Sequence, residues 1–315
     1  MAQWQWELAI LLSKLVAYLS FVSLTGGLFV LLLGASPRSV DAAGSPFGIA
    51  WSPAARVRIL WLLLLASGAG FLSISLFFLL QVGLINENGL AGMLDTFMWQ
   101  LLAQTPIGAG VILRQAGFLL FALLLLLHFK RLSAPLSPEL PTSFGVVGVL
   151  GVLLCCAGFA ALGHVAGLDL LAQLAIGLHV LAAGLWIGAL YPLYTLCRTE
   201  RASALYPLMK RFGDWAWGIT LTLVAAGVYL LYRLLHSPAE LLTTAYGKLL
   251  ALKIVFLLCL LGLAALNKFR LVPALQAAGT TVLQRSIRGE MWLAGLILLL
   301  TAILSTVTGP AHLMG

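Results

Sequence analysis

The sequence predicts an all-α membrane protein, a polytopic bundle of about eight transmembrane helices. Of its 315 residues, 62% are hydrophobic and 9% are charged, which is more apolar surface than a water-soluble fold can bury. Apolar runs of about 18 or more residues recur along the chain, and each can cross a bilayer core of roughly 30 Å as a helix. The longest polar stretches are Ser36–Arg58 and Ile85–Pro106. They leave little room for a soluble domain, so we expect one integral-membrane domain over 1–315.

Eight apolar spans follow one another along the chain, at roughly 7–34, 58–84, 107–129, 143–163, 170–197, 212–235, 246–267 and 286–308. Polar or charged connections separate them. In order, these connections are Ser36–Arg58, Ile85–Pro106, Lys130–Pro141, His164–Asp169, Arg198–Arg211, His236–Tyr246 and Lys268–Arg288.

Basic residues are confined to alternate connections. The connections after the first, third, fifth and seventh spans hold 13 of the 18 Lys and Arg residues, and the other three connections hold none. Basic residues of membrane proteins gather on the cytoplasmic side, so this pattern predicts that both chain termini lie outside. The same rule accounts for the net charge of +8, and we therefore expect no nucleic-acid partner.

A short internal similarity links the third and seventh spans. Thr105-Pro-Ile-Gly108 with Arg114 matches Thr244-Ala-Tyr-Gly247 with Lys253 at a constant offset of 139 residues. This favours two parallel four-helix repeats with tentative halves 1–142 and 143–315, an arrangement known from transporters. The alternative is chance, because two apolar helices resemble each other easily. If the repeat is real, we expect Arg114 and Lys253 to hold the halves together.

One histidine lies just before the fifth span and another lies inside it. His164 lies just before it, and His179 lies about ten residues inside it, about 15 Å from its outer end. An ionisable side chain within a membrane helix is costly, so it predicts a functional site. The alternative is that His179 only forms a hydrogen bond to a neighbouring helix.

Small residues in the fifth span predict that it packs closely on another helix. Gly177, Gly184 and Gly188 form the pattern, and the four-residue spacing of the last two lets a neighbouring backbone approach. Trp186 lies seven residues after His179, about two turns on, and so on the same side of the helix. We therefore expect His179 to face protein rather than lipid.

Residues with copper-binding chemistry are concentrated toward the outer side. Imidazole, thioether and thiolate groups together suit copper, and the sulfur ligands favour Cu(I). The candidate ligands are His164, His179 and His312, with Cys156, Met93, Met98 and Met314 as further candidates. For Cys156 the alternative is a structural role, because buried cysteine is a common small hydrophobic residue.

The remaining charges in the spans have simpler interpretations. Glu290 follows Arg288, and we expect the two to pair at the cytoplasmic interface, with a proton-coupling role for Glu290 as the alternative. Lys14 is explained by its long side chain reaching toward the interface. No nucleotide-binding loop is present, so we expect no enzyme activity. Transport would then depend on a gradient or on delivery by a partner.

Three blocks of sequence lie between about 143 and 310. They are Gly163-His164 and Leu178-His179 with Gly184–Gly188; Tyr246–Lys253 with Asn267–Pro273; and Arg285–Glu290. Together they resemble the bacterial copper resistance protein D family. The resemblance implies an inner-membrane protein that handles copper, as Cu(I) or Cu(II), between periplasm and cytoplasm beside a periplasmic copper-binding partner. It also implies that His164 and His179 bind copper, with Trp186 beside them.

Three functions follow from these observations. The first is a copper permease in the lipid bilayer, acting in uptake, which captures the ion near His164 and His312 and passes it to His179. The second is a haem-binding electron-transfer protein, but bis-histidine ligation needs two histidines at matched depth and His179 has no such partner in the spans. The third is a scaffold that delivers copper to another protein without transport.

Overall fold

The computed structural model describes residues 3–34, 51–134, 140–162, 169–235 and 237–307. Within these ranges the fold is all-α, and eight helices are long and apolar enough to cross a membrane. The long helices are α1 (Gln3–Gly34), α2 (Pro53–Asn86), α5 (Pro106–Ser133), α6 (Thr142–Ala160), α7 (Leu170–Thr199), α8 (Ala202–Leu234), α10 (Ala245–Leu266) and α12 (Thr281–Leu304). The short ones are α3 (Gly89–Gly92), α4 (Thr96–Ala103), α9 (Glu240–Thr243), α11 (Leu275–Ala278) and a π-helical turn, η1 (Asn267–Leu271).

All eight predicted spans are confirmed as helices. The largest difference is the start of α8, which begins at Ala202 rather than near residue 212. The helix continues through Pro207, Lys210 and Arg211, the residues that indicate a connection in the sequence. The polar stretch between the second and third spans also contains a helix, α4, which Asp95 caps by accepting hydrogen bonds from the backbone N–H groups of Phe97 and Met98.

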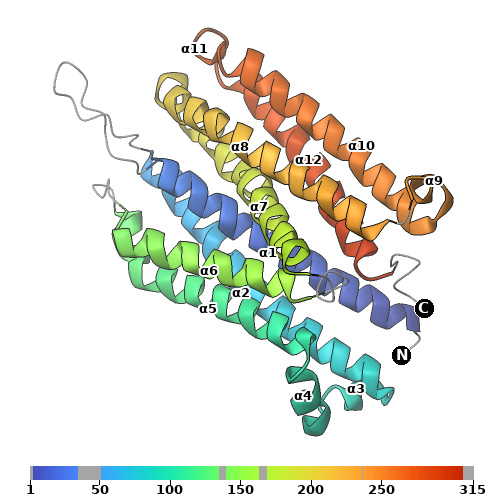
Figure 1. The fold of residues 1–315 in the computed structure, drawn as a ribbon. Helices are drawn as coiled ribbons and strands as arrows, with labels where there is room; N and C mark the ends of the chain where they lie inside the picture. Colours follow the sequence, from blue (N-terminus) through green and yellow to red (C-terminus); the bar gives the residue numbers. More distant parts are fainter. Residues whose placement is uncertain (1–2, 35–50, 135–139, 163–168, 236, 308–315) are drawn as a thin grey trace.

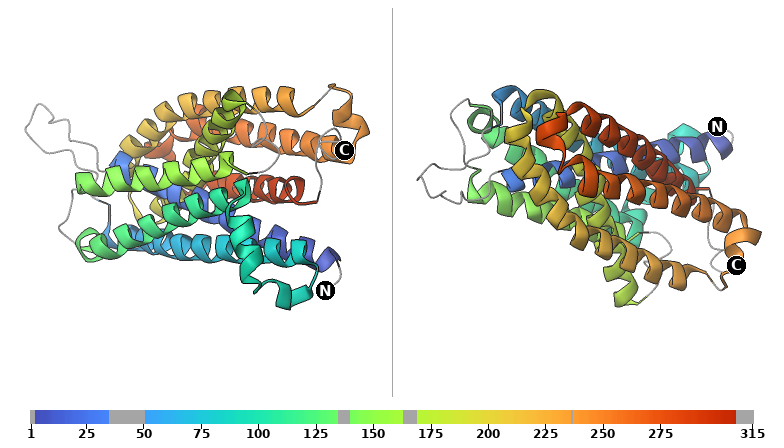
Figure 2. Two further views of the ribbon diagram at one scale, coloured as in Figure 1. Left: turned by 60° about the horizontal axis from the view of Figure 1, so that its bottom comes forward. Right: turned by 90° about the horizontal axis from the view of Figure 1, so that it is seen from above.

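The long helices form two neighbouring groups in chain order (Figure 1). Helices α1, α2, α5 and α6 make the first group, and α7, α8, α10 and α12 make the second. Helix α1 lies between the groups, because it packs on α2 and α6 and also on α7, α8 and α12. The turned views show the same division (Figure 2). The grouping agrees with the tentative halves, while the duplication itself stays a prediction.

The two ends of the bundle differ in the short helices that they carry. Helices α3, α4 and α9 lie at one end, which we call the α4 end, and α11 lies at the other, the α11 end (Figure 1). Helices α5, α7 and α10 each run from the side of the α4 end toward the α11 end (Figure 1).

The contact between α1 and α7 depends on glycines that the sequence singles out. A side chain at Gly184 would press against Phe21 and Thr25 of α1, which confirms that this glycine lies at a close helix contact. The prediction for Gly177 is wrong, because no atom lies within 4 Å of the position that its Cβ would occupy. A glycine in an apolar helix therefore does not by itself indicate a packing contact.

Candidate metal site

The described residues contain part of the predicted copper-binding set. His164, His312 and Met314 lie outside them. His179, Cys156, Met93 and Met98 lie inside, as do Trp186, Arg114, Lys253 and Glu290. Within the described ranges, no three side chains of His, Cys, Asp or Glu come together as a metal-binding group.

His179 is held by a hydrogen bond between α7 and α8. Its Nδ1 lies 3.1 Å from the carbonyl oxygen of Leu223. A carbonyl oxygen only accepts, so Nδ1 carries the proton and donates it, and the lone pair of the neutral imidazole is on Nε2. The ring packs against Gly227, where a Cβ would come within 3.1 Å of the imidazole. The glycine thus makes room for the histidine at this helix contact.

A cationic side chain lies within electrostatic range of this imidazole. Lys253 of α10 is close enough to His179 for the two to interact electrostatically. His179 lies nine residues into α7 and Lys253 eight residues into α10, so each is about 12–14 Å along its own helix from the first residue. Any cation that binds His179 is therefore repelled by the positive charge of Lys253.

Trp186 lies deeper in the same helix contact. Its side chain is buried in a cluster with Ala182, Ile219 and Leu223, which links α7 to α8. Leu223, whose carbonyl bonds His179, therefore belongs to the same buried cluster as Trp186. This agrees with the prediction that Trp186 and His179 share one side of α7.

An ion pair fixes the start of α7 to the end of α8. Asp169 caps α7 by accepting a hydrogen bond of 2.9 Å from the backbone N–H of Ala172. Arg233 donates to the same carboxylate at 2.7 Å and to the hydroxyl of Tyr229 at 2.8 Å. The Arg233 hydrogen bond, with that from Ala172, holds the pKa of the Asp169 carboxyl below its usual value. This pair joins the same two helices that the hydrogen bond between His179 and Leu223 joins.

The sulfur candidates lie in other contacts. Met93 packs toward Gly83 of α2 and Trp6 of α1, and its carbonyl accepts a hydrogen bond of 2.7 Å from the indole of Trp99. Met98 lies in α4, which packs on α2 and α5. These contacts belong to the first group of helices. His179 lies in α7 and is bonded to α8, and both helices belong to the second group.

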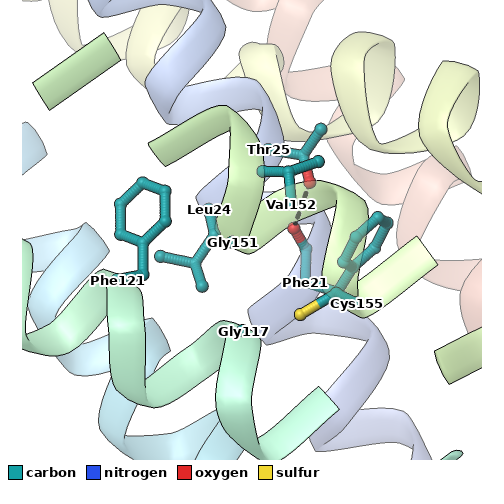
Figure 3. Close-up of a pocket in the computed structure, with 8 residues that line it drawn as sticks. All are labelled: Phe21, Leu24, Thr25, Gly117, Phe121, Gly151, Val152 and Cys155. Atoms are coloured by element: carbon teal, nitrogen blue, oxygen red, sulfur yellow. Dashed lines mark hydrogen bonds between the residues drawn. The ribbon is translucent and has the colours of Figure 1, made fainter. Parts of the chain in front are cut away.

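Cys156, which lies in α6, is buried in the main apolar core of the bundle. Its neighbour Cys155 lines a small pocket between α1, α5 and α6, with its sulfur directed toward Gly117 (Figure 3). The thiol of Cys155 also donates to the carbonyl of Arg114 at 3.7 Å. Phe21, Leu24, Phe121 and Val152 make up most of the remaining wall, so this pocket has the chemistry of a packing defect rather than of a metal site.

Arg114 does not join the two halves in the way that the repeat predicts. Its guanidinium group lies over the rings of Phe77 and Phe159, which belong to α2 and α6 of its own group. Lys14, which the sequence explains by snorkelling, instead turns toward α12 and donates to the carbonyl of Ser305. The sequence gives no signal for the contact between Lys14 and Ser305, because these residues are 291 positions apart.

Glu290 has a different partner from the one predicted. Its carboxyl accepts a hydrogen bond of 2.8 Å from the side-chain amide of Asn267, in the π-helical turn η1, and no ion pair with Arg288 occurs among the described residues. Glu290 is 3% exposed, and the amide oxygen of Asn267 is buried without a partner. A proton on the carboxyl would satisfy that oxygen. The pair therefore has the hydrogen-bonding pattern of a carboxylic acid beside an amide.

Comparison with known proteins supports the family resemblance. Residues 206–304 match the family model described as Copper resistance protein D, which confirms the similarity seen in the sequence. No curated protein and no solved structure gives a significant match. The matched segment runs from α8 to α12 and includes Leu223, Lys253 and Glu290, whereas His179 precedes it. The chain is thus a multi-pass membrane protein in which residues 206–304 are similar to copper resistance protein D.

Proposed function

We propose that this protein binds copper at His179 and moves it between the two sides of a bacterial inner membrane, in the direction of uptake. The termini would lie in the periplasm, as the distribution of basic residues favours. His164 and His312 would capture the ion at the outer side, with a periplasmic copper-binding protein as the donor. His179 would then hold the ion within the membrane.

The observation that carries this proposal is the hydrogen bond between His179 Nδ1 and the carbonyl of Leu223. Metal-binding histidines typically donate their second ring nitrogen to a carbonyl or carboxylate, which fixes the tautomer and raises the basicity of the ligating nitrogen. Here Nδ1 donates its hydrogen bond to the carbonyl of Leu223, so Nε2 is the nitrogen that binds copper in this proposal. A histidine that served only to join two helices would need the same bond, so copper binding itself must be measured.

The positions of the histidines favour copper over haem. The other described histidine, His128, lies 22 residues into α5 and packs on Phe144 of α6, whereas His179 lies nine residues into α7 and is bonded to α8. Two imidazoles must reach opposite faces of one iron for bis-histidine ligation. His128 and His179 contact different groups of helices, so the two do not form such a pair.

The test is a Cu(I) titration of the purified protein in detergent, in competition with a chromophoric chelator. His128→Ala is the matched control, because His128 Nδ1 also lies 3.1 Å from a backbone carbonyl, that of Leu124 in its own helix. We expect His179→Ala to weaken Cu(I) binding at least tenfold and His128→Ala to leave it unchanged. Equal affinities of the wild type and His179→Ala would overturn the proposal. A Soret absorption band lost in His179→Ala would establish the haem alternative instead.

Transport and delivery are separated by a flux measurement. Proteoliposomes that hold the wild type should accumulate copper, and those that hold His179→Ala should not. Intact Cu(I) binding without flux would favour the scaffold, which hands copper to another protein. His164→Ala and His312→Ala should lower the rate of uptake while leaving Cu(I) bound at His179.

A further inference from the structure

Two cations from different helices meet beside one aromatic ring in the first group of helices. Lys14 Nζ lies 5.7 Å from the centroid of the Phe77 ring, and Arg114 Cζ lies 5.8 Å from the same centroid. The two cations also interact electrostatically with each other. Like charges repel, so this arrangement needs a compensating group.

The hydrogen-bond partners of both cations are neutral. Arg114 Nε donates to the carbonyl of Gly110 at 2.9 Å, and the Arg114 guanidinium lies 5.2 Å from the ring of Phe159. Lys14 donates to the carbonyl of Ser305 at 2.5 Å. Among the described residues, the one ion pair joins Arg233 to Asp169, so no carboxylate there neutralises Lys14 or Arg114.

One donor of this cluster is buried and unused. Arg114 is 3% exposed, and its Nη2 has no hydrogen-bond partner. A guanidinium group presents five N–H donors and cannot be neutralised by losing a proton in a protein. Contacts with aromatic rings offset part of the cost of burying it, but they do not satisfy the N–H groups of Nη2. The structure therefore leaves a strong donor directed into the bundle without an acceptor.

The neighbouring hydroxyl groups do not fill this role. Ser305 Oγ donates to the carbonyl of Ala302 at 3.1 Å, so in its 3.1 Å contact with Tyr18 it accepts the phenol proton. The Tyr18 ring in turn packs on Phe159, with the centroids 5.7 Å apart. Tyr18 and Ser305 thus fix the position of α12 against α1, and the free donors are those of Lys14 and Arg114.

We propose that Lys14 and Arg114 form a binding site for an oxyanion, a phosphate or carboxylate group, near the α4 end of the first group of helices. The planar guanidinium group binds two oxygens of such an anion at once, and the ammonium group has N–H donors beyond the one given to Ser305. The anion supplies the negative charge that the described side chains lack. This site is separate from His179, and it does not depend on copper binding.

The site can be tested on the whole purified protein by thermal unfolding in detergent, with sodium phosphate or sodium acetate titrated at constant ionic strength. We expect a saturable rise of the unfolding midpoint in the wild type, because a ligand of the folded state stabilises it. Lys14→Met should weaken the apparent affinity for phosphate at least tenfold, and Lys14→Arg should retain it. Lys248→Met, which removes an exposed cation at the same end of the bundle, is the control and should behave as the wild type.

The source of the oxyanion is decided by native mass spectrometry of the protein purified in detergent, which reports the lipids that stay bound. Retention of an anionic phospholipid by the wild type, with loss in Lys14→Met and displacement by free phosphate, would assign the site to a lipid headgroup. A wild type that binds free phosphate or acetate and retains no lipid would assign it to a soluble anion. The proposal is overturned if the wild type and Lys14→Met respond equally to both anions and retain the same lipids.

Discussion

Gly26 of α1 and Gly188 of α7 touch through their backbones where the two groups of helices meet. A Cβ on Gly188 would overlap the carbonyl of Val22, and a Cβ on Gly26 would overlap the main chain of Gly188 and Ala189. Membrane helices approach this closely only where small residues face each other. The contact joins α7, which carries His179, directly to α1, which carries Lys14.

Gly188→Ala should therefore destabilise the protein. The added methyl group must separate α1 from α7, and overpacking of this kind costs about 1–3 kcal/mol. Gly177→Ala is the matched control on the same helix, since its Cβ would meet no atom within 4 Å. It should be neutral or stabilise α7 by up to about 1 kcal/mol through helix propensity. The free energy of unfolding in mixed micelles compares the two, and equal losses would contradict the close contact.

The pair of Asp169 and Arg233 predicts a pH dependence of stability. The folded-state pKa of Asp169 is lowered by its hydrogen bonds from Arg233 and Ala172, so its contribution is complete above the ordinary aspartate pKa of about 3.9. The contribution is lost as the pH falls through the lowered pKa. Asp169→Asn keeps a helix-capping oxygen and removes the charge. The unfolding midpoint of Asp169→Asn should be slightly lower than that of the wild type at pH 7.

The same comparison at low pH provides the check. The difference between the wild type and Asp169→Asn should stay constant from pH 7 to about pH 5 and shrink below about pH 4. A difference that grew as the pH fell would show that Asp169 is destabilised by its surroundings in the folded state. Arg233→Gln should reproduce the loss at pH 7, because the carboxylate then lacks its guanidinium partner.

The transmembrane helices follow from hydropathy because each backbone polar group must be satisfied within its own helix in the bilayer. That requirement is local, so single-sequence reasoning finds the eight spans. Helix α4 was missed because its residues are too few for a span, although Asp95 at its N-terminus is a recognisable cap. The packing role of Gly188 and the lack of one at Gly177 depend on which helix lies opposite, and that is not a local property.

The candidate site is likewise predicted from the sequence only in part. His179 is identified by the cost of an imidazole in a membrane helix. The internal similarity gives Lys253 only a role in joining the halves, and it does not predict the electrostatic interaction of Lys253 with His179. The Leu223 carbonyl that fixes its tautomer has no signature, because any residue supplies a carbonyl. Asn267, the partner of Glu290, was also missed, since polar pairs between α12 and the π-helical turn form only after the helices have packed. The π-helical geometry itself often marks functional sites.

Glu290 and Asn267 predict opposite outcomes for two substitutions. Glu290→Ala leaves the buried amide of Asn267 without its acceptor and should destabilise the protein by about 1–3 kcal/mol. Glu290→Gln keeps the acceptor and adds a donor for the unpartnered oxygen of Asn267, so stability should be equal to or above that of the wild type. Copper flux into proteoliposomes then tests proton coupling. Normal flux in Glu290→Gln would limit Glu290 to a structural role.

Lys253 predicts that the affinity for copper can be raised by a substitution. Its ammonium group repels a metal cation bound to His179, and Lys253→Met removes this charge while keeping a side chain of similar length. We expect Lys253→Met to bind Cu(I) on the order of tenfold more tightly, about 1.4 kcal/mol, and Lys253→Arg to resemble the wild type. The competition titration measures both, with the exposed Lys248→Met as the control. Weaker binding in Lys253→Met would mean that Lys253 supports copper binding, for instance by holding an anionic ligand of the metal.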